Sequence, residues 1–89
     1  MEAELLRIIE ACFDIPENEI IQRPEEKLLG SKYNKSQVEF SVFVMECCER
    51  YDIEYSRFFD CFIDSSYKGL LETLRACMRK YNAESCNAG

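Results

Sequence analysis

The sequence predicts an all-α protein with three longer helices, one short helix and a long loop after the first helix. Apolar residues recur at i, i+3, i+4 and i+7 in three stretches, which is the spacing of one buried helix face. No stretch shows the apolar–polar alternation that is typical of a strand. The chain has 89 residues, of which 47% are hydrophobic, and this length and composition suit a single folded domain.

The first helix is predicted over 2–13 and a long connection over 14–35. The helical spacing comes from Leu5, Ile8, Ile9 and Cys12. Pro16 ends this helix, because the residue before a proline is pushed out of the α region. A connection of this length needs apolar anchors in the core. We expect these anchors to be Ile15, Ile20, Ile21, Leu28 and Leu29.

The central helix is predicted over 36–51, a stretch without Gly or Pro. Ser36 and Glu39 match the S-x-x-E pattern of a capping box, which places the helix start at Ser36. At about 100° per residue, one broad face is apolar and comprises Phe40, Phe43, Val44, Cys47, Cys48 and Tyr51. Away from it lie acids beside small aliphatic residues. We call this set the acidic face; it comprises Val38, Glu39, Val42, Met45, Glu46 and Glu49.

A short helix is predicted over 57–62, capped by Ser56. It should bury three aromatic residues, Phe58, Phe59 and Phe62. The last helix begins after a cap at Asp64, Ser65 or Ser66. Its apolar stripe comprises Tyr67, Leu70, Leu71, Leu74, Cys77, Met78 and Tyr81.

The domain is expected to span 1–82 and to be followed by a flexible polar tail over 83–89. Gly69 lies inside the last helix, where it costs about 1 kcal/mol relative to alanine. We expect the central and last helices to share one core, formed by Phe40, Phe43, Val44, Leu70, Leu71 and Leu74.

The net charge is −6 and the chain contains no histidine. This balance argues against a nucleic-acid partner and favours partners with basic surfaces. The N-terminus is acidic where a signal peptide has a basic region, and no apolar stretch approaches the length of a transmembrane helix. We therefore expect a cytoplasmic, monomeric protein without a membrane partner.

The six cysteines are expected to be free thiols, because the cytosol is reducing and no C-x-x-C motif is present. Cys12, Cys47 and Cys77 fall on apolar stripes, where cysteine behaves as a small hydrophobic residue. Cys86 lies in the tail and should react fastest. The sequence shows no nucleophile–base pair, phosphate-binding glycine loop or metal-ligand cluster, so we expect neither an enzyme nor a metal site. A small thiol- or metal-binding helical protein remains an alternative.

Four segments of the chain resemble acyl carrier proteins, in the order in which that family has them. Phe13-Asp-Ile-Pro-Glu-Asn-Glu-Ile20 resembles the close of the first helix, and Leu28-Leu-Gly30 resembles the Leu-Gly before the carrier motif. Glu49-Arg-Tyr-Asp-Ile-Glu-Tyr55 resembles the end of the second helix, and Ser65-Ser-Tyr-Lys-Gly-Leu-Leu71 the start of the last. The resemblance implies a right-handed four-helix bundle. It also implies docking of basic partner enzymes on the second helix.

The family attaches phosphopantetheine to the serine of an L-G-x-D-S-L motif, and this sequence departs from that motif. Counting forward from Leu29-Gly30 puts Tyr33 at the serine position, whereas counting back from Tyr51 puts Gln37 there. Ser36 is the nearest serine, and Ser31 is a second candidate. Ser36 has two possible roles. It either carries phosphopantetheine or serves only as the helix cap that Glu39 completes.

These observations lead to an expected function. We expect a non-enzymatic, acyl-carrier-related protein that lacks a phosphopantetheine arm and docks to a basic-surfaced partner enzyme through the acidic face. The alternative is a working acyl or peptidyl carrier with phosphopantetheine on Ser36. Divergent proteins of this kind occur in systems for peptide or natural-product maturation, which is the context that the resemblance suggests.

Overall fold

The computed structural model is 69% helical, and it describes the backbone of residues 1–29 and 33–88 and the side chains of 1–29 and 33–78. Within these ranges it has no strand, only two isolated bridges. The predicted all-α class is confirmed. Five helices are present in the described part of the chain: α1 (Glu2–Phe13), α2 (Glu17–Gln22), α3 (Gln37–Tyr51), α4 (Tyr55–Cys61) and α5 (Tyr67–Ala88).

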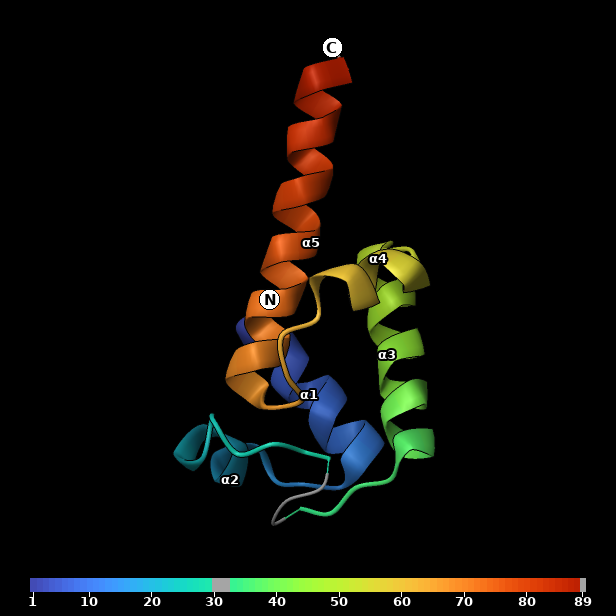
Figure 1. Ribbon diagram of the computed structural model, residues 1–89. Helices are drawn as coiled ribbons and strands as arrows, with labels where there is room; N and C mark the ends of the chain where they lie inside the picture. Colours follow the sequence, from blue (N-terminus) through green and yellow to red (C-terminus); the bar gives the residue numbers. More distant parts are fainter. Residues whose placement is uncertain (30–32, 89) are drawn as a thin grey trace.

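The helices are arranged around α1, which packs against α2, α3 and α5 (Figure 1). The short helix α4 packs against both α3 and α5. Helix α5 extends beyond the other helices towards the C-terminus (Figure 1). It stays helical as far as Ala88, so it continues through most of the predicted tail over 83–89. The flexibility of that tail stays a prediction.

The predicted long loop contains the extra helix α2, so the chain has two short helices where one was expected. Pro16 precedes α2, and two acids, Glu17 and Glu19, occupy its first turn, where the helix dipole favours negative charge. Ile20 is buried, but Ile21 is 58% exposed, and its predicted role as an anchor is wrong. Adjacent residues on a helix point about 100° apart, so the pair cannot both face α1.

Helix α4 begins two residues earlier than predicted, with Glu54 rather than Ser56 in the cap position. Phe58 is fully buried and Phe62 is partly buried. Phe59 is 44% exposed, and the prediction that it would be buried is wrong. As at Ile20 and Ile21, the neighbouring Phe58 takes the position that faces the core.

Helices α1 and α3 end in the same way, with an aspartate in the left-handed region. Asp14 has φ 58° and Asp52 has φ 55°. Their backbone N–H groups donate to the carbonyl oxygens of Glu10 and Cys48, respectively. These bonds satisfy carbonyl groups that the end of a helix leaves without partners.

A network of buried polar groups starts α5. Ser66 Oγ accepts from the N–H of Gly69 at 3.0 Å, and Asp64 Oδ1 accepts from the Ser66 N–H at 2.9 Å and from its hydroxyl at 2.5 Å. Of the three predicted caps, Ser66 is therefore the cap of α5. Thr73, which is fully buried, donates its hydroxyl to the Gly69 carbonyl and accepts from the Ile63 N–H at 3.1 Å. The segment between α4 and α5 is thus fixed to the first turns of α5.

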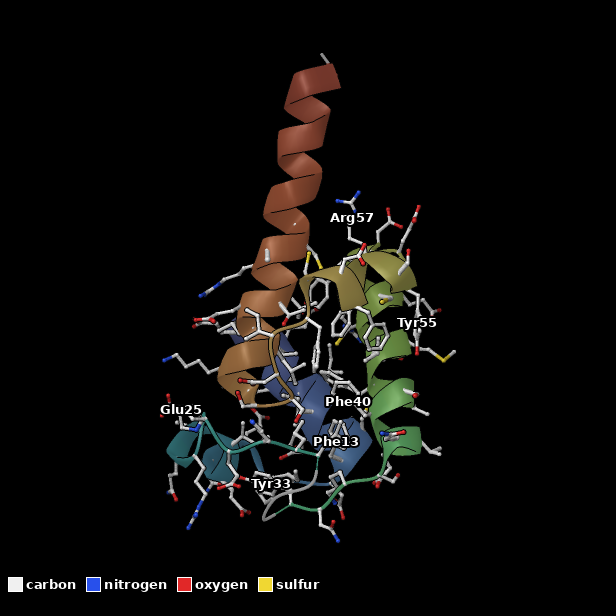
Figure 2. All side chains as sticks on the ribbon, in the orientation of Figure 1. Phe13, Glu25, Tyr33, Phe40, Tyr55 and Arg57 are labelled. Atoms are coloured by element: carbon white, nitrogen blue, oxygen red, sulfur yellow. The ribbon has the colours of Figure 1, made fainter. Side chains whose placement is uncertain are left out.

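The core is one cluster, and it contains all six residues predicted to meet there. Its aromatic rings run from α1 through α3 to α4. Phe13 lies 5.4 Å from Phe43 between ring centroids, Phe43 lies 5.9 Å from Phe40, and Phe40 lies 5.8 Å from Phe62. Phe13 and Phe40 are labelled in Figure 2. This row of rings fixes α3 between its neighbours, with the acidic face directed away from the core.

Candidate docking site on helix α3

Ser36 caps helix α3, as the sequence predicted. Its hydroxyl accepts from the Glu39 N–H at 3.2 Å and donates to Glu39 Oε1 at 3.1 Å. The same carboxylate oxygen accepts from the Ser36 N–H at 3.1 Å, which completes the capping box. The bonds from the Ser36 N–H and hydroxyl lower the pKa of Glu39 below its ordinary value. Ser36 is exposed, whereas Gly30 and Ser31 lie outside the described residues.

Replacing Ser36 by alanine should lower the free energy of unfolding by about 1 kcal/mol, because the Glu39 N–H then loses its side-chain acceptor. Urea denaturation followed by circular dichroism would measure the loss. Ser36→Thr is the matched control and should retain most of the stability, since threonine keeps the hydroxyl. An alanine variant as stable as the wild type would show that this cap contributes nothing.

The aliphatic residues of the acidic face are exposed in one row along α3. Val38 is 74% exposed, Val42 55% and Met45 59%. Their spacing of four and three residues puts them on one side of the helix. Phe43, Val44 and Cys47 are fully buried on the opposite side. The row therefore has no role in the core of this chain.

The three acids of the acidic face have different surroundings. Glu39 belongs to the capping box. Glu46 pairs with Arg50 at 3.5 Å, and Arg50 also bonds Glu4 of α1 at 3.1 Å. Glu49 is exposed and has no ion-pair partner among the side chains at 1–29 and 33–78. Glu49 is thus the acid most available to a partner.

The site extends onto α1, whose residues are not part of the predicted acidic face. An open groove between α1 and α3 has a volume of about 610 Å³ and is lined by Glu4, Arg7, Ile8, Ala11, Cys12, Val42, Glu46 and Arg50. The neighbouring Tyr51 hydroxyl and the Arg50 guanidinium, which donates to Glu4, lower the pKa of Glu4, so this carboxylate stays charged. The spacing along the sequence could have indicated this contribution of α1. Glu4 and Ala11 are seven residues apart, so they lie on the same, polar side of that helix.

Two aromatic residues of α4 are exposed at the surface, which was not predicted from the sequence. Tyr55, labelled in Figure 2, is 46% exposed. Its ring lies 5.1 Å from that of the exposed Phe59. No sequence pattern indicates this exposure, because a run of aromatic residues in a short helix predicts burial. The pair presents apolar surface on the helix that follows α3.

The thiols are free at the five cysteines whose side chains are described, as predicted for a reducing compartment. Cys47 is fully buried, and burial raises its pKa to about 12. Cys86 lies outside the described side chains. Among the described residues, no group of three or more His, Cys, Asp or Glu side chains is placed to hold a metal ion.

Comparisons with known proteins leave the family open: no family model, curated protein or solved structure matches this chain. In the part of the chain that is described, no helix combines the length and apolar character needed to cross a membrane. The class of protein that the fold and site define is thus a small helical protein with an apolar row exposed beside acidic groups. Its function has to be argued from that surface.

Proposed function

We propose that this protein is a non-enzymatic, acyl-carrier-related docking protein that binds a basic-surfaced partner enzyme through the acidic face. It acts as a monomer and carries no phosphopantetheine arm. The observation that carries the proposal is the exposed row of Val38, Val42 and Met45 with acids along it. Exposed apolar residues that gather on one face are typical of protein interaction sites.

The charges near the row favour a basic partner. Glu46 and Glu49 are both exposed on α3, and the whole chain has a net charge of −6. Complementary charge speeds encounter and suppresses wrong partners, while the apolar row supplies surface to bury. The capping box and the ion pairs of Arg50 keep part of the acidic face ordered before binding. A partner therefore pays a smaller ordering cost.

The relation to acyl carrier proteins is supported by the order of the elements. A long connection follows α1, and then come a 15-residue helix, a 7-residue helix and a 22-residue helix. This order suits the four-helix bundle that the resemblance implies, with α2 as a short addition within the connection. The bundle is part of the proposal.

The surroundings of Ser36 support the proposal that the protein carries no phosphopantetheine arm. Its hydroxyl both accepts and donates within the capping box, so modification would compete with the helix start. Lys35 and Gln37 flank it where the family has Asp and Leu. One observation favours the alternative of a working carrier, namely that Ser36 is exposed at the start of α3.

Intact mass separates these two functions. We expect no gain of mass after the protein is incubated with coenzyme A and a broad-range phosphopantetheinyl transferase. A conventional acyl carrier protein in the same tube is the positive control. Complete modification of the wild type, abolished in Ser36→Ala, would make the working carrier correct.

Reversing the charge of Glu49 should weaken docking, since this acid is exposed and the change breaks no ion pair within the described side chains. A photoreactive residue at Met45, one turn before Glu49, would record the contact in a lysate of the source organism, where the salt concentration can be varied. We expect Glu49→Lys to lower the crosslinked yield at least about threefold at low salt and less at high salt.

Glu72→Lys is the matched control, because it makes the same charge change at an exposed position of α5. It should leave the crosslinked yield at Met45 unchanged. Equal losses of crosslinked yield from Glu49→Lys and Glu72→Lys would show that the effect comes from the net charge of the protein and not from the position of Glu49. A crosslink that survives Glu49→Lys at every salt concentration would contradict docking through this face.

A further inference from the structure

Two cysteines from different helices lie side by side where α4 packs against α5. The fully buried Cys77 of α5 donates its thiol to the Arg57 carbonyl oxygen at 3.6 Å. The thiol of Cys61, the last residue of α4, is a close neighbour of this sulfur and interacts with it electrostatically. In an α-helix the carbonyl of residue i faces the N–H of residue i+4, so the Arg57 carbonyl lies next to Cys61.

A second hydrogen bond fixes how α4 and the segment after it pack against α5. The Ile63 N–H donates to Thr73 Oγ1 at 3.1 Å, and Thr73 lies one turn before Cys77 on α5. The contacts from Arg57 to Cys77 and from Ile63 to Thr73 therefore lie on either side of Cys61 in the sequence. Both hydrogen bonds lie at the contact between α4 and α5, so the sulfurs of Cys61 and Cys77 stay close without movement of the rest of the fold.

We infer that Cys61 and Cys77 form a redox-responsive pair, which closes into a disulfide by exchange with a low-molecular-weight disulfide such as oxidised glutathione. This function is independent of docking through α3. The reduced pair is the state of the protein in a reducing compartment, and the disulfide forms when oxidised glutathione accumulates.

The exchange takes place in two balanced steps. The Cys61 thiol loses its proton to solvent, and its sulfur attacks one sulfur of oxidised glutathione, which releases one glutathione thiolate. The Cys77 sulfur then loses its proton and attacks the Cys61 sulfur of the mixed disulfide, which releases the second thiolate. Both thiolates take up a proton. Overall, two protein thiols are oxidised to one disulfide, and one glutathione disulfide is reduced to two thiols.

The exposure of the two sulfurs assigns their order of reaction. Cys61 is partly exposed, so glutathione disulfide can reach it first. Cys77 is fully buried, and burial together with the neighbouring Cys61 thiol raises its pKa to about 12. Cys77 therefore stays protonated and unreactive towards external disulfides, and acts only on the mixed disulfide beside it.

The test exposes the reduced full-length protein to oxidised glutathione without oxygen and then blocks remaining thiols by alkylation. We expect an intact mass lower by two hydrogens and a peptide map that joins Cys61 to Cys77. The bond closes a short loop between α4 and α5 and should raise Tm by about 10 °C. Dithiothreitol should reverse both changes.

Variants distinguish the pair from general thiol oxidation. Cys77→Ser should stop at a glutathione adduct on Cys61, and Cys61→Ser should leave Cys77 reduced. Cys12→Ser, at a partly buried cysteine of α1, is the matched control and should close the bond as the wild type does. The wild-type peptide map decides the matter even if Cys77→Ser fails to fold. A bond from Cys77 to Cys48, a lasting adduct on wild-type Cys61, or unchanged thiols would each overturn the inference.

Discussion

Replacing Phe43 by alanine is expected to lower the free energy of unfolding by about 3–5 kcal/mol. Phe43 is fully buried, and its ring lies between those of Phe13 and Phe40, at 5.4 and 5.9 Å. The substitution removes these ring contacts and leaves a cavity between α1 and α3. Urea denaturation followed by circular dichroism at 222 nm would measure the loss.

Phe59→Ala is the matched control, because it makes the same chemical change at a ring that is 44% exposed. We expect Phe59→Ala to lower the free energy of unfolding by less than half as much as Phe43→Ala, since water already surrounds part of the Phe59 ring. Equal losses at the two positions would contradict the placement of α3 on α1. Substantial sheet in the wild-type spectrum would contradict the fold itself.

Replacing Gly69 by alanine should lower the free energy of unfolding by about 2–3 kcal/mol, although alanine is the better helix former by about 1 kcal/mol. The added Cβ would overlap Asp64 Oδ1, and it would lie 2.6 Å from Asp64 Cγ and 3.0 Å from the Asp64 carbonyl oxygen. The carboxylate would have to leave Ser66, to which it is bound through both the N–H and the hydroxyl. A lower free energy of unfolding in Gly69→Ala would therefore show that the clash with Asp64 outweighs the better helix propensity of alanine, and a higher one would show the reverse.

The pH dependence of this variant gives an independent check. Hydrogen bonds from Ser66 hold the pKa of Asp64 below its ordinary value. Asp64 therefore stabilises the fold above its unfolded pKa of about 3.9, and that contribution is lost as the pH falls through the lower folded pKa. Gly69→Ala has already displaced the carboxylate. The gap in stability between wild type and variant should be largest near neutral pH and narrow below about pH 4.

A double-mutant cycle identifies the clash. In an Asp64→Ala background, the further change Gly69→Ala should cost much less than in the wild type, because the carboxylate that it would overlap is gone. The two changes should therefore be strongly non-additive. If Gly69→Ala instead stabilised the wild type, the close approach of Asp64 to Gly69 would be wrong.

The sequence was sufficient for features that depend on neighbours along the chain. The helix over 2–13, the capping box of Ser36 and Glu39, and the start of the last helix near Ser66 all follow from local hydrogen bonding and periodicity. The exposed row of α3 could also be predicted, because a single helix with one apolar face directs its remaining residues outward.

Features that depend on distant residues were not predictable. Nothing local says which of two adjacent apolar residues faces the core, so Ile21 and Phe59 were misplaced. The ion pair of Arg50 with Glu4 joins residues 46 positions apart. The closeness of Cys61 and Cys77 depends on how α4 packs against α5, and spacing in the sequence does not reveal it.

The two aspartates that end α1 and α3 have a consequence for protein engineering. Asp14 and Asp52 hold left-handed backbone angles, which cost a residue with a side chain about 1–2 kcal/mol relative to glycine. Glycine loses more backbone freedom on folding, by about 0.5–1 kcal/mol, so the net gain from each replacement lies between zero and about 1.5 kcal/mol. Both side chains are exposed, and neither belongs to the acidic face. A more heat-resistant scaffold with an unaltered docking surface should therefore start from Asp14→Gly and Asp52→Gly.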